Sequence, residues 1–452
     1  MSAEAILTEL APRPQNFEVG TVVAEIPIAP RELDLSPDLS PIQIVRTDIY
    51  DPNIEYLEAT RPGRVRALQS QEQVMNDFSR ARFSVWRHHE HGVPYAQTER
   101  RLDSEESIAS GDPVSRARYF NDPDFLGDDA LRAWRSTVPT AIALAPLANP
   151  FNTSKVEDNH GQLHDVTEYA QEWMTACTDG WEIRNRTALM VESMSTFLSR
   201  TAQQEPTKNI TVVSVAGGTA LATMQAIMHS GVGPARVELI LLESSERSAT
   251  MAFELAEQIG FTSKISLEAM DVFSPAAMAE LTARLEATGR KATALDAVGI
   301  AEYSSTHMRT EALVGRYGED YMLYNPEKFI EACLGLVEAD GMVVVGQMRA
   351  DRPNPYFTRG VVSWPYICMR TVKRFAEVMR DGGVNLSLTK FSLTPLGSYT
   401  MATLYRSEAA ARLGGLQPIA EAASISWPAW MRGIRTRRAA PSVGGVIMSE
   451  PA

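Results

Sequence analysis

The chain has 452 residues, 44% of them hydrophobic and 22% charged, and its formal net charge at pH 7 is -13. This length is enough for two domains, or for one domain with a large extension. The composition is that of an ordinary globular protein, and the acidic balance argues against nucleic acid as the default partner. No apolar run approaches the roughly 20 residues of a membrane helix, and the N-terminus lacks a signal-peptide pattern.

Cysteine and histidine spacing gives no metal motif. Cys177, Cys333 and Cys368 are far apart, so we expect buried, reduced thiols in a cytoplasmic protein. Two histidine groups, at 88–91 and 160–164, do not match a zinc spacing such as His-Glu-x-x-His. We therefore expect no bound metal.

The first part of the chain is expected to be an extension. Residues 1–61 are rich in Pro, Asp and Glu and predict an extended arm, with an edge strand at 21–26 that stops at Pro27. An apolar stripe predicts a helix at 64–86.

Two helices are then expected to lead into the first long strand, at 165–177 and 183–201. The polar stretch 179–186 lies at the start of the second of these helices. It is either a capped helix N-terminus or part of a cover over a binding site, with Arg184 and Arg186 as candidate ligand contacts.

Residues 209–271 form the most informative stretch. An apolar, β-branched run at 211–215 leads into Ala216-Gly217-Gly218-Thr219, a helical pattern at 219–229, and a second apolar run at 237–242 that stops at Glu243. This order of strand, glycine turn, helix, strand and acid is typical of a nucleotide-binding βαβ unit. Glycine lets the backbone approach a ligand, and the carboxylate can accept the hydroxyls of a ribose.

The pattern of alternating strands and helices continues to residue 405. Strands are expected at 265–270, 294–300, 342–347, 385–393 and 398–405, and helices at 275–286, 326–337 and 370–379. The alternation predicts a parallel sheet covered on both faces, and the last two strands predict an antiparallel hairpin. Asp271, at the end of the third strand, is expected to reach an adenine edge.

Taken together, these features resemble the class I (Rossmann-like) S-adenosylmethionine-dependent methyltransferase superfamily between Ile183 and Arg406. The resemblance is carried by Ala216-Gly217-Gly218, Glu243, Asp271 and the segment around Asp296. It implies an α/β, doubly wound, mostly parallel seven-stranded sheet with a terminal antiparallel hairpin, preceded by a mainly helical N-terminal extension or lid. The expected domains are 1–164 (extension and lid), 165–406 (cofactor-binding domain) and 407–452 (tail).

The sequence departs from the family pattern at the first strand. Ser214 stands where the family usually has an acid, and Ala216 and Ala220 stand where two spaced glycines are usual. Alanine is a small replacement, so the turn can survive. The missing acid leaves open how the amino group of the methionine moiety is held.

In open α/β sheets, ligands bind outside the carboxyl ends of the strands, which fixes the candidate site residues. The expected S-adenosylmethionine contacts are Ala216, Gly217, Gly218, Thr219, Glu243, Ser244, Asp271, Val272 and Gly299. The candidates for catalysis are Glu302, Tyr303 and His307, each with an ordinary capping, packing or loop role as its alternative. The candidate acceptor contacts are Arg184, Arg186, Tyr356, Trp364 and Tyr366.

The resemblance implies methyl transfer from S-adenosylmethionine to a small-molecule acceptor, for example in secondary metabolism. We expect no nucleic-acid or membrane partner, and a homodimer is the assembly to test. Three alternatives stay open: a non-methylating enzyme that uses the same cofactor for cyclisation or aminocarboxypropyl transfer, a non-catalytic binding module, and a dinucleotide oxidoreductase. The terminal hairpin does not fit the last of these.

Overall fold

The computed structural model describes residues 20–39, 41–91, 127–138, 140–362, 364 and 367–416, with side chains described for all of these except 82–91, 141 and 307. Contacts divide the chain into two units, Met1–Leu416 and Gln417–Ala452, and every described residue lies in the first. Within the described ranges, no helix combines the length and the apolarity needed to cross a membrane.

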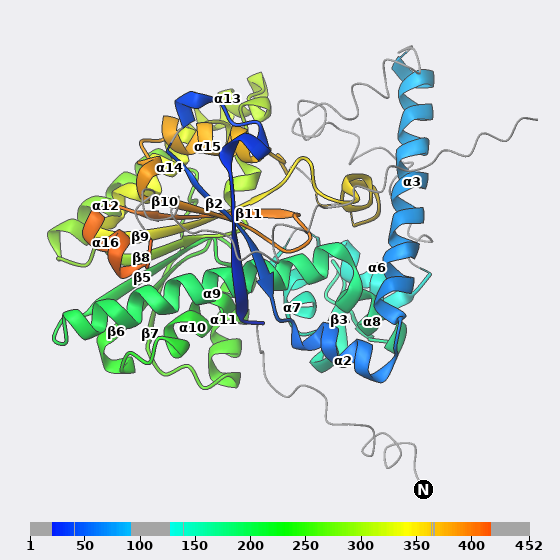
Figure 1. Ribbon diagram of the computed structural model, residues 1–452, viewed down its shortest axis with the longest axis horizontal. Coiled ribbons are helices and arrows are strands. Elements are labelled where there is room, and N and C mark those ends of the chain that lie inside the picture. The colour runs from blue at the N-terminus through cyan, green and yellow to red at the C-terminus, as the bar shows by residue number, and fades with distance from the viewer. Residues whose placement is uncertain are drawn as a thin grey trace, which may run out of the picture. The chain divides into compact units, whose positions relative to one another are not determined.

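One nine-stranded sheet organises this unit (Figure 1). Its strands are β1 (Val22–Ile28), β2 (Gln43–Ile49), β5 (Ile210–Val215), β6 (Val237–Leu242), β7 (Lys264–Glu268), β8 (Ala292–Ala297), β9 (Val337–Met348), β10 (Thr389–Leu393) and β11 (Tyr399–Tyr405). Their order is β1-β2-β10-β11-β9-β8-β5-β6-β7. A separate antiparallel pair consists of β3 (Lys155–Glu157) and β4 (Leu163–Asp165).

The parallel part of the sheet is doubly wound. The strands from β7 to β9 are mutually parallel, and their spatial order reverses between β5 and β8. Such a reversal opens a crevice at the carboxyl ends of the two strands, where ligands of open α/β sheets bind. The predicted terminal hairpin is confirmed, since β10 pairs with β11 and β11 with β9, both antiparallel.

The prediction of seven strands is wrong, because the N-terminal arm adds two more. β2 pairs in parallel with β10, and β1 pairs antiparallel with β2. The expected edge strand is β1, although it continues through Pro27 to Ile28. Proline is tolerated there because β1 is the edge strand. No strand of the described residues lies beyond it that would need a hydrogen bond from the backbone N–H that proline lacks. β2 is anchored by Thr47, whose hydroxyl donates to the Leu393 carbonyl at 2.7 Å.

Helices cover both faces of the sheet (Figure 1). One face packs against α12 (Pro275–Ala287), α14 (Pro326–Gly335) and α15 (Val372–Asp381). The other packs against α9 (Thr178–Gln204), α10 (Leu221–His229), α11 (Glu246–Gln258) and α16 (Glu408–Leu413). β5 and β8 are buried along their whole length, which explains their mainly apolar sequences.

A third apolar cluster joins the N-terminal helices to the carboxyl end of β9 and the adjacent start of β11. The helices are α2 (Pro52–Thr60), α3 (Arg64–His91), α6 (Asp129–Ser136), α7 (Ala141–Ala148) and α8 (Glu168–Ala176). They pack with the first turns of α9 and with a π-helix, η10 (Phe357–Val362). Trp134, Trp173 and Phe357 form the centre of this cluster through ring contacts at 5.7 and 5.8 Å. The short helix α13 (Glu311–Tyr317) follows β8.

α9 begins at Thr178, five residues before the predicted start at Ile183. Cys177 is its N-cap, and the thiol sulfur accepts a hydrogen bond from the Gly180 N–H at 3.3 Å. A Cβ at Gly180 would lie 2.1 Å from the Met174 carbonyl oxygen, so only glycine fits. The polar stretch 179–186 thus forms the first turns of α9, as the capped helix N-terminus expected from the sequence, and most of it is buried.

All three cysteines are free and buried. Cys177 belongs to the helical cluster over the strand ends, and Cys333 belongs to the core between the sheet and α14. Burial raises the pKa of the Cys177 thiol well above its usual value, and it raises the pKa of Cys333 to about 12. Both thiols are therefore protonated and inert while the chain is folded.

Candidate functional site

The turn after β5 adopts backbone angles that glycine favours. Ala216, Gly218 and Ala220 have φ values of 47°, 57° and 49°. Non-glycine residues rarely adopt positive φ, and such residues cluster at ligand sites. The two alanines that replace the usual glycines therefore keep the glycine-like backbone, and α10 begins directly after the second of them.

Gly217 is required by its neighbour in the first strand. A Cβ at Gly217 would lie 2.0 Å from the Ser214 hydroxyl oxygen. Ser214 pairs in register with Asp296 on β8, and the Thr223 hydroxyl on α10 donates to the Asp296 carboxylate. Asp296 is 3% exposed, so this acid fastens β8 to α10 inside the core. The acid missing from β5 is thus not replaced at the ligand side by Asp296.

Glu243 closes β6 beside the glycine turn. Its carboxylate accepts the Gly218 N–H at 3.2 Å and the Ser245 N–H at 2.8 Å. Two backbone donors fix the side chain, yet an ionised carboxylate has about four lone-pair positions. The remaining positions are free to accept the two hydroxyls of a ribose, which is the role expected from the sequence.

Asp271 lies apart from this group. β7 ends at Glu268, earlier than predicted, and Asp271 sits in the following turn. Its carboxylate accepts the Phe273 N–H at 3.0 Å and the Tyr321 hydroxyl at 2.7 Å. Burial and this hydrogen bond to Asp271 both raise the pKa of Tyr321. The residue that reaches the site from this turn is Phe273, and neither Asp271 nor Val272 lines it.

A cavity of about 620 Å³ lies at the carboxyl ends of the strands, a size typical of small-molecule sites. Among the predicted residues, its wall contains Ala216, Gly217, Gly218, Glu243, Ser244, Gly299, Arg186, Glu302, Tyr303 and Trp364. The wall also contains Thr140, Leu144, Ile183, Ser245, Ser248, Phe273, Val298, Ile300, Met308, Leu313, Leu323, Met348, Ile367 and Tyr399, which were not predicted. Most of these additions are apolar, so the cavity wall is largely apolar.

The end of the cavity away from the glycine turn is built around Arg186. Its guanidinium carbon lies 4.7 Å from the centre of the Tyr399 ring, within the range of a cation–π contact. Gly299 has a φ of 89°, and a Cβ there would lie 3.2 Å from a guanidinium nitrogen of Arg186. Gly299 therefore makes room for this arginine, and it was predicted for a different reason.

Glu302 is a poorly placed general base. One carboxylate oxygen accepts the Met348 N–H at 2.9 Å, and the other faces the Arg186 guanidinium at 3.5 Å. Burial raises the pKa of this carboxyl, and the Arg186 charge acts in the opposite direction. With its oxygens engaged, Glu302 is suited to orienting Arg186 and the end of β9.

The structure describes the side chain of Tyr303 but not that of His307. Tyr303 lines the cavity, and burial, followed by the Glu302 charge, raises the pKa of its hydroxyl, so it stays neutral. The backbone of His307 lies in a short 3₁₀ helix, but its side chain falls outside the described atoms.

Two of the predicted acceptor contacts, Arg184 and Tyr356, do not line the cavity wall, and a third lies outside the described residues. Arg184 points into the protein, where it binds Asp51 and three backbone carbonyls. Tyr356 is 8% exposed, and its N–H donates to the Asn76 side chain at 3.0 Å. Tyr366 lies outside the described residues. Thr219 completes the predicted set and is likewise absent from the cavity wall.

The histidine groups provide no metal cluster in the described part of the chain, where no three His, Cys, Asp or Glu residues converge. His164 lies 3.0 Å from the Asp158 carboxylate, and this hydrogen bond is the main cause that lowers the pKa of Asp158 to about 2. The side chains at 88–91 fall outside the described atoms.

No protein-family model and no curated protein matches the chain. Similar solved structures include a possible exported protein from Bordetella parapertussis, with 12% identity over 76% of this chain and 98% of that chain and a TM-score of 0.41. An O-methyltransferase family protein from Burkholderia thailandensis has 13% identity over 79% and 99%, with a TM-score of 0.34. The magnesium protoporphyrin IX methyltransferase from Synechocystis, solved with bound SAH, has 8% identity over 50% and 87%, with a TM-score of 0.32.

Two of these three solved structures are methyltransferases by their names, at 13% and 8% identity to this chain. These TM-scores lie below 0.5, so the matches assign no role to any residue of the cavity. The function of the site has to be inferred from the geometry of this chain.

Proposed function

We propose that this protein is an S-adenosylmethionine-dependent methyltransferase that acts on a small molecule. The observation that carries the proposal is the single cavity at the reversal point of the sheet. It joins a glycine turn and a strand-end carboxylate, which suit a nucleoside, to a second, largely apolar end. A nucleoside cofactor and an acceptor molecule can therefore meet in one water-poor space.

The residues at the first end fit the cofactor. The turn at 216–218 presents backbone without large side chains, and Glu243 keeps lone pairs for the ribose hydroxyls. Phe273 supplies an apolar surface for the adenine. When bound, S-adenosylmethionine would supply a methyl group already activated by the sulfonium, so the protein mainly has to position the two reactants.

Proton handling is the weaker contribution of this site. Glu302 is buried and engaged, and Tyr303 is neutral. An acceptor atom that loses its proton readily, or to solvent, therefore suits the site better than one that needs a strong protein base. The chain's own contribution would be orientation of the acceptor and exclusion of water.

We also propose that the N-terminal helices act as a cover over the cofactor and acceptor. Thr140 and Leu144, next to and within α7, line the cavity. Hydrogen exchange with and without S-adenosylmethionine tests this. We expect added protection in α3, α7 and the first turns of α9, and protection confined to residues around 216, 243 and 271 would contradict it.

The main test is calorimetric binding of S-adenosylmethionine and S-adenosylhomocysteine to the full chain, followed by mass spectrometry of the molecules that it retains. Methylated product together with S-adenosylhomocysteine supports the proposal. Methylthioadenosine would instead identify aminocarboxypropyl transfer, and a rearranged acceptor with intact cofactor would identify cyclisation. Absence of any binding would leave a non-catalytic module, and binding of a nicotinamide dinucleotide would leave an oxidoreductase.

A further inference from the structure

Arg184 and Arg186, two positions apart on α9, differ in how many hydrogen bonds they make. Arg184 is 3% exposed and makes four hydrogen bonds. Its Nε donates to the Asp51 carboxylate at 2.8 Å, and its Nη atoms donate to the carbonyls of Leu147, Met174 and Thr175 at 2.9, 3.3 and 2.5 Å. Four of the five N–H donors of this guanidinium are therefore used by the protein.

Arg186 is almost as buried, with 7% of its side chain exposed, but it is not satisfied. Among the described residues it makes one hydrogen bond, to Glu302 at 3.5 Å, the outer limit for such a bond. Its Nε is buried and has no partner there. A guanidinium has five N–H donors, and leaving them unpaired away from bulk water is costly.

Trp364 is a second residue of the cavity wall with an unpaired hydrogen-bond donor. It is 5% exposed, and its indole Nε1 is buried without a hydrogen-bond partner in the described part of the chain. Buried indole N–H groups usually have a partner. Arg186 and Trp364 both contribute to the wall of the 620 Å³ cavity, so an acceptor bound in the cavity is the candidate partner for both side chains.

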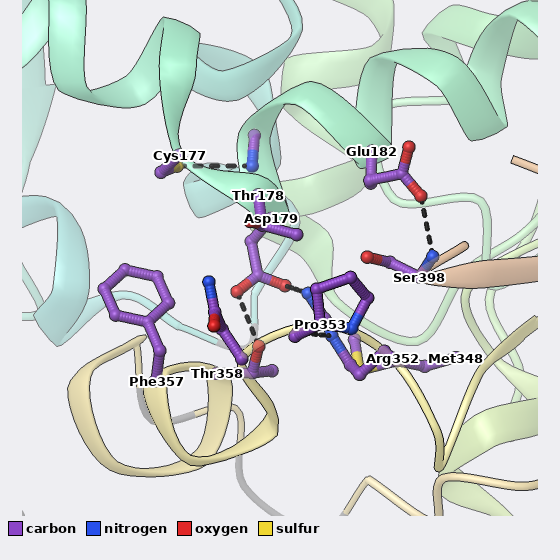
Figure 2. Close-up of polar contacts among 12 residues, drawn as sticks. Cys177, Thr178, Asp179, Glu182, Met348, Arg352, Pro353, Phe357, Thr358 and Ser398 are labelled. Atoms are coloured by element: carbon purple, nitrogen blue, oxygen red, sulfur yellow. Dashed lines mark hydrogen bonds and ion pairs between the residues drawn. The ribbon is translucent and has the colours of Figure 1, made fainter. Parts of the chain in front are cut away.

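The other buried arginines near Glu302 have their partners outside the cavity wall, although the Nη atoms of Arg352 make no hydrogen bond within the described part of the chain. Arg370 donates to the Gln347 side chain at 2.6 Å and to the carbonyls of Ala301 and Ser304. Arg352 forms an ion pair with Asp179 at 2.9 Å, with both side chains fully buried (Figure 2). Of these cations, Arg186 is the one in the cavity wall, and its contact with Glu302 is long, at 3.5 Å. Among the residues of the cavity wall, Arg186 is the one cation, and the wall also holds two carboxylates, Glu302 beside Arg186 and Glu243 beside the glycine turn.

From this geometry we propose that the acceptor is an apolar molecule with one carboxylate, which the Arg186 guanidinium and the Trp364 indole N–H bind. The assignment rests on the proposed function for the role of this molecule as methyl acceptor. A planar guanidinium binds a carboxylate through two parallel hydrogen bonds, which sets the orientation of the molecule. The carboxylate is the anchor, and the atom to be methylated lies toward the glycine turn.

The test compares carboxylates with their neutral amides on the full chain. The probe pairs are benzoate and benzamide, 2-naphthoate and 2-naphthamide, and octanoate and octanamide, each titrated calorimetrically with and without saturating S-adenosylhomocysteine. For at least one pair we expect the carboxylate to bind ten-fold or more tightly than the amide. If no carboxylate binds more tightly than its amide, the proposal is overturned.

Variants assign the preference to the two donors. Arg186→Gln should remove the carboxylate preference to within two-fold while amide binding persists, and Trp364→Phe should reduce the preference by several-fold. Arg186→Lys keeps the charge and should keep part of the preference, which covers the case in which the glutamine variant does not fold. Arg374→Gln, a matched loss of charge at a half-exposed position on α15, should leave the preference unchanged.

The outcomes separate this inference from the proposed function. A carboxylate preference that depends on Arg186 in a protein that binds no S-adenosylhomocysteine would keep the anion site and remove the methyltransferase. Binding of S-adenosylhomocysteine together with a preference that survives in folded Arg186→Gln would keep the cofactor and overturn the anion site.

Discussion

The two ends of the cavity differ in the kind of polar group that lines them. At the glycine turn, the polar groups are backbone N–H groups and one carboxylate, positioned by residues close together in sequence. At the other end, the polar group from α9 is the Arg186 guanidinium, and the turns of α9 that carry it are held by partners more than a hundred residues away. The first kind of site is set by local backbone conformation, whereas the second depends on the whole fold being in place.

Figure 2 shows how the second end is held. The Asp179 carboxylate pairs with Arg352 and accepts the Thr358 hydroxyl at 2.9 Å. One turn further along α9, Glu182 accepts the Ser398 N–H at 2.8 Å from the β10–β11 turn. These contacts fix the first turns of α9 against two loops, and they thereby fix the position from which Arg186 reaches the cavity.

The largest effect on stability is expected at Asp179, which holds the first turns of α9. Asp179→Ala leaves the Arg352 charge buried without its partner, and removing one member of a buried ion pair costs about 3–5 kcal/mol. Denaturant unfolding measures the loss of free energy. The control is the double variant Asp179→Leu with Arg352→Met, which removes both charges and should recover most of the stability. A loss below about 1 kcal/mol in the single variant would contradict the expectation.

The second prediction concerns Glu243 at the other end. Glu243→Ala should weaken S-adenosylmethionine binding by about 1.5–3 kcal/mol, the range for charge-assisted hydrogen bonds. Calorimetry on the folded variant measures this. Glu246→Ala, at an exposed position in the first turn of α11, is the matched control. Unchanged affinity in Glu243→Ala would remove this residue from the cofactor site.

Gly218→Val tests whether the turn itself is needed for binding. A β-branched residue at a φ of 57° is strained by about 1–3 kcal/mol, and its side chain stands where the ligand approaches. Binding should fall by more than stability does. Gly233→Val is the control, because its φ is -57° and nothing lies within 4 Å of its added Cβ. Unfolding with intact affinity in the remaining folded protein would show a purely structural turn.

The smallest effect is expected at Ala216. Glycine at its φ of 47° relieves about 1–2 kcal/mol of left-handed strain, offset by about 0.4–1 kcal/mol of added unfolded-chain entropy. Ala216→Gly should therefore stabilise the protein by about 0.5–1 kcal/mol in thermal or denaturant unfolding. Ala279→Gly, at an exposed position inside α12, should instead cost about 1 kcal/mol. Destabilisation in both variants would show that the turn is not strained.

What could be predicted from the sequence follows the same division. The β5 strand, the glycine turn and Glu243 rest on local signals, and β6 has the predicted bounds of Val237–Leu242. β2 was not predicted, because its pairing with β10 joins segments about 346 residues apart and leaves no periodic signal of its own. The buried state of residues 179–186 was hidden for a related reason, since polar side chains look solvated until their distant partners are known.

Two cavity residues show how small shifts of register matter. Phe273 rather than Asp271 lines the cavity, because β7 ends two residues before the predicted Met270. Tyr399 reaches the site because β11 starts opposite Met348, at the end of β9 where the ligand side lies. The hairpin was predicted, but which of its residues would meet the end of β9 depends on strand register, which the sequence did not specify.

The rate at which each buried thiol is alkylated can report how often the protein opens at that position. Cys177 caps α9 inside the helical cluster, whereas Cys333 lies under the sheet in a separate core. Since thiolates react and buried thiols do not, alkylation at neutral pH proceeds only through molecules that have opened at that position. In variants that retain only Cys177 or only Cys333, the alkylation rate would therefore measure the opening of each region separately. Faster labelling at Cys177 than at Cys333 would mean that the helical cluster over the strand ends lifts while the sheet stays folded.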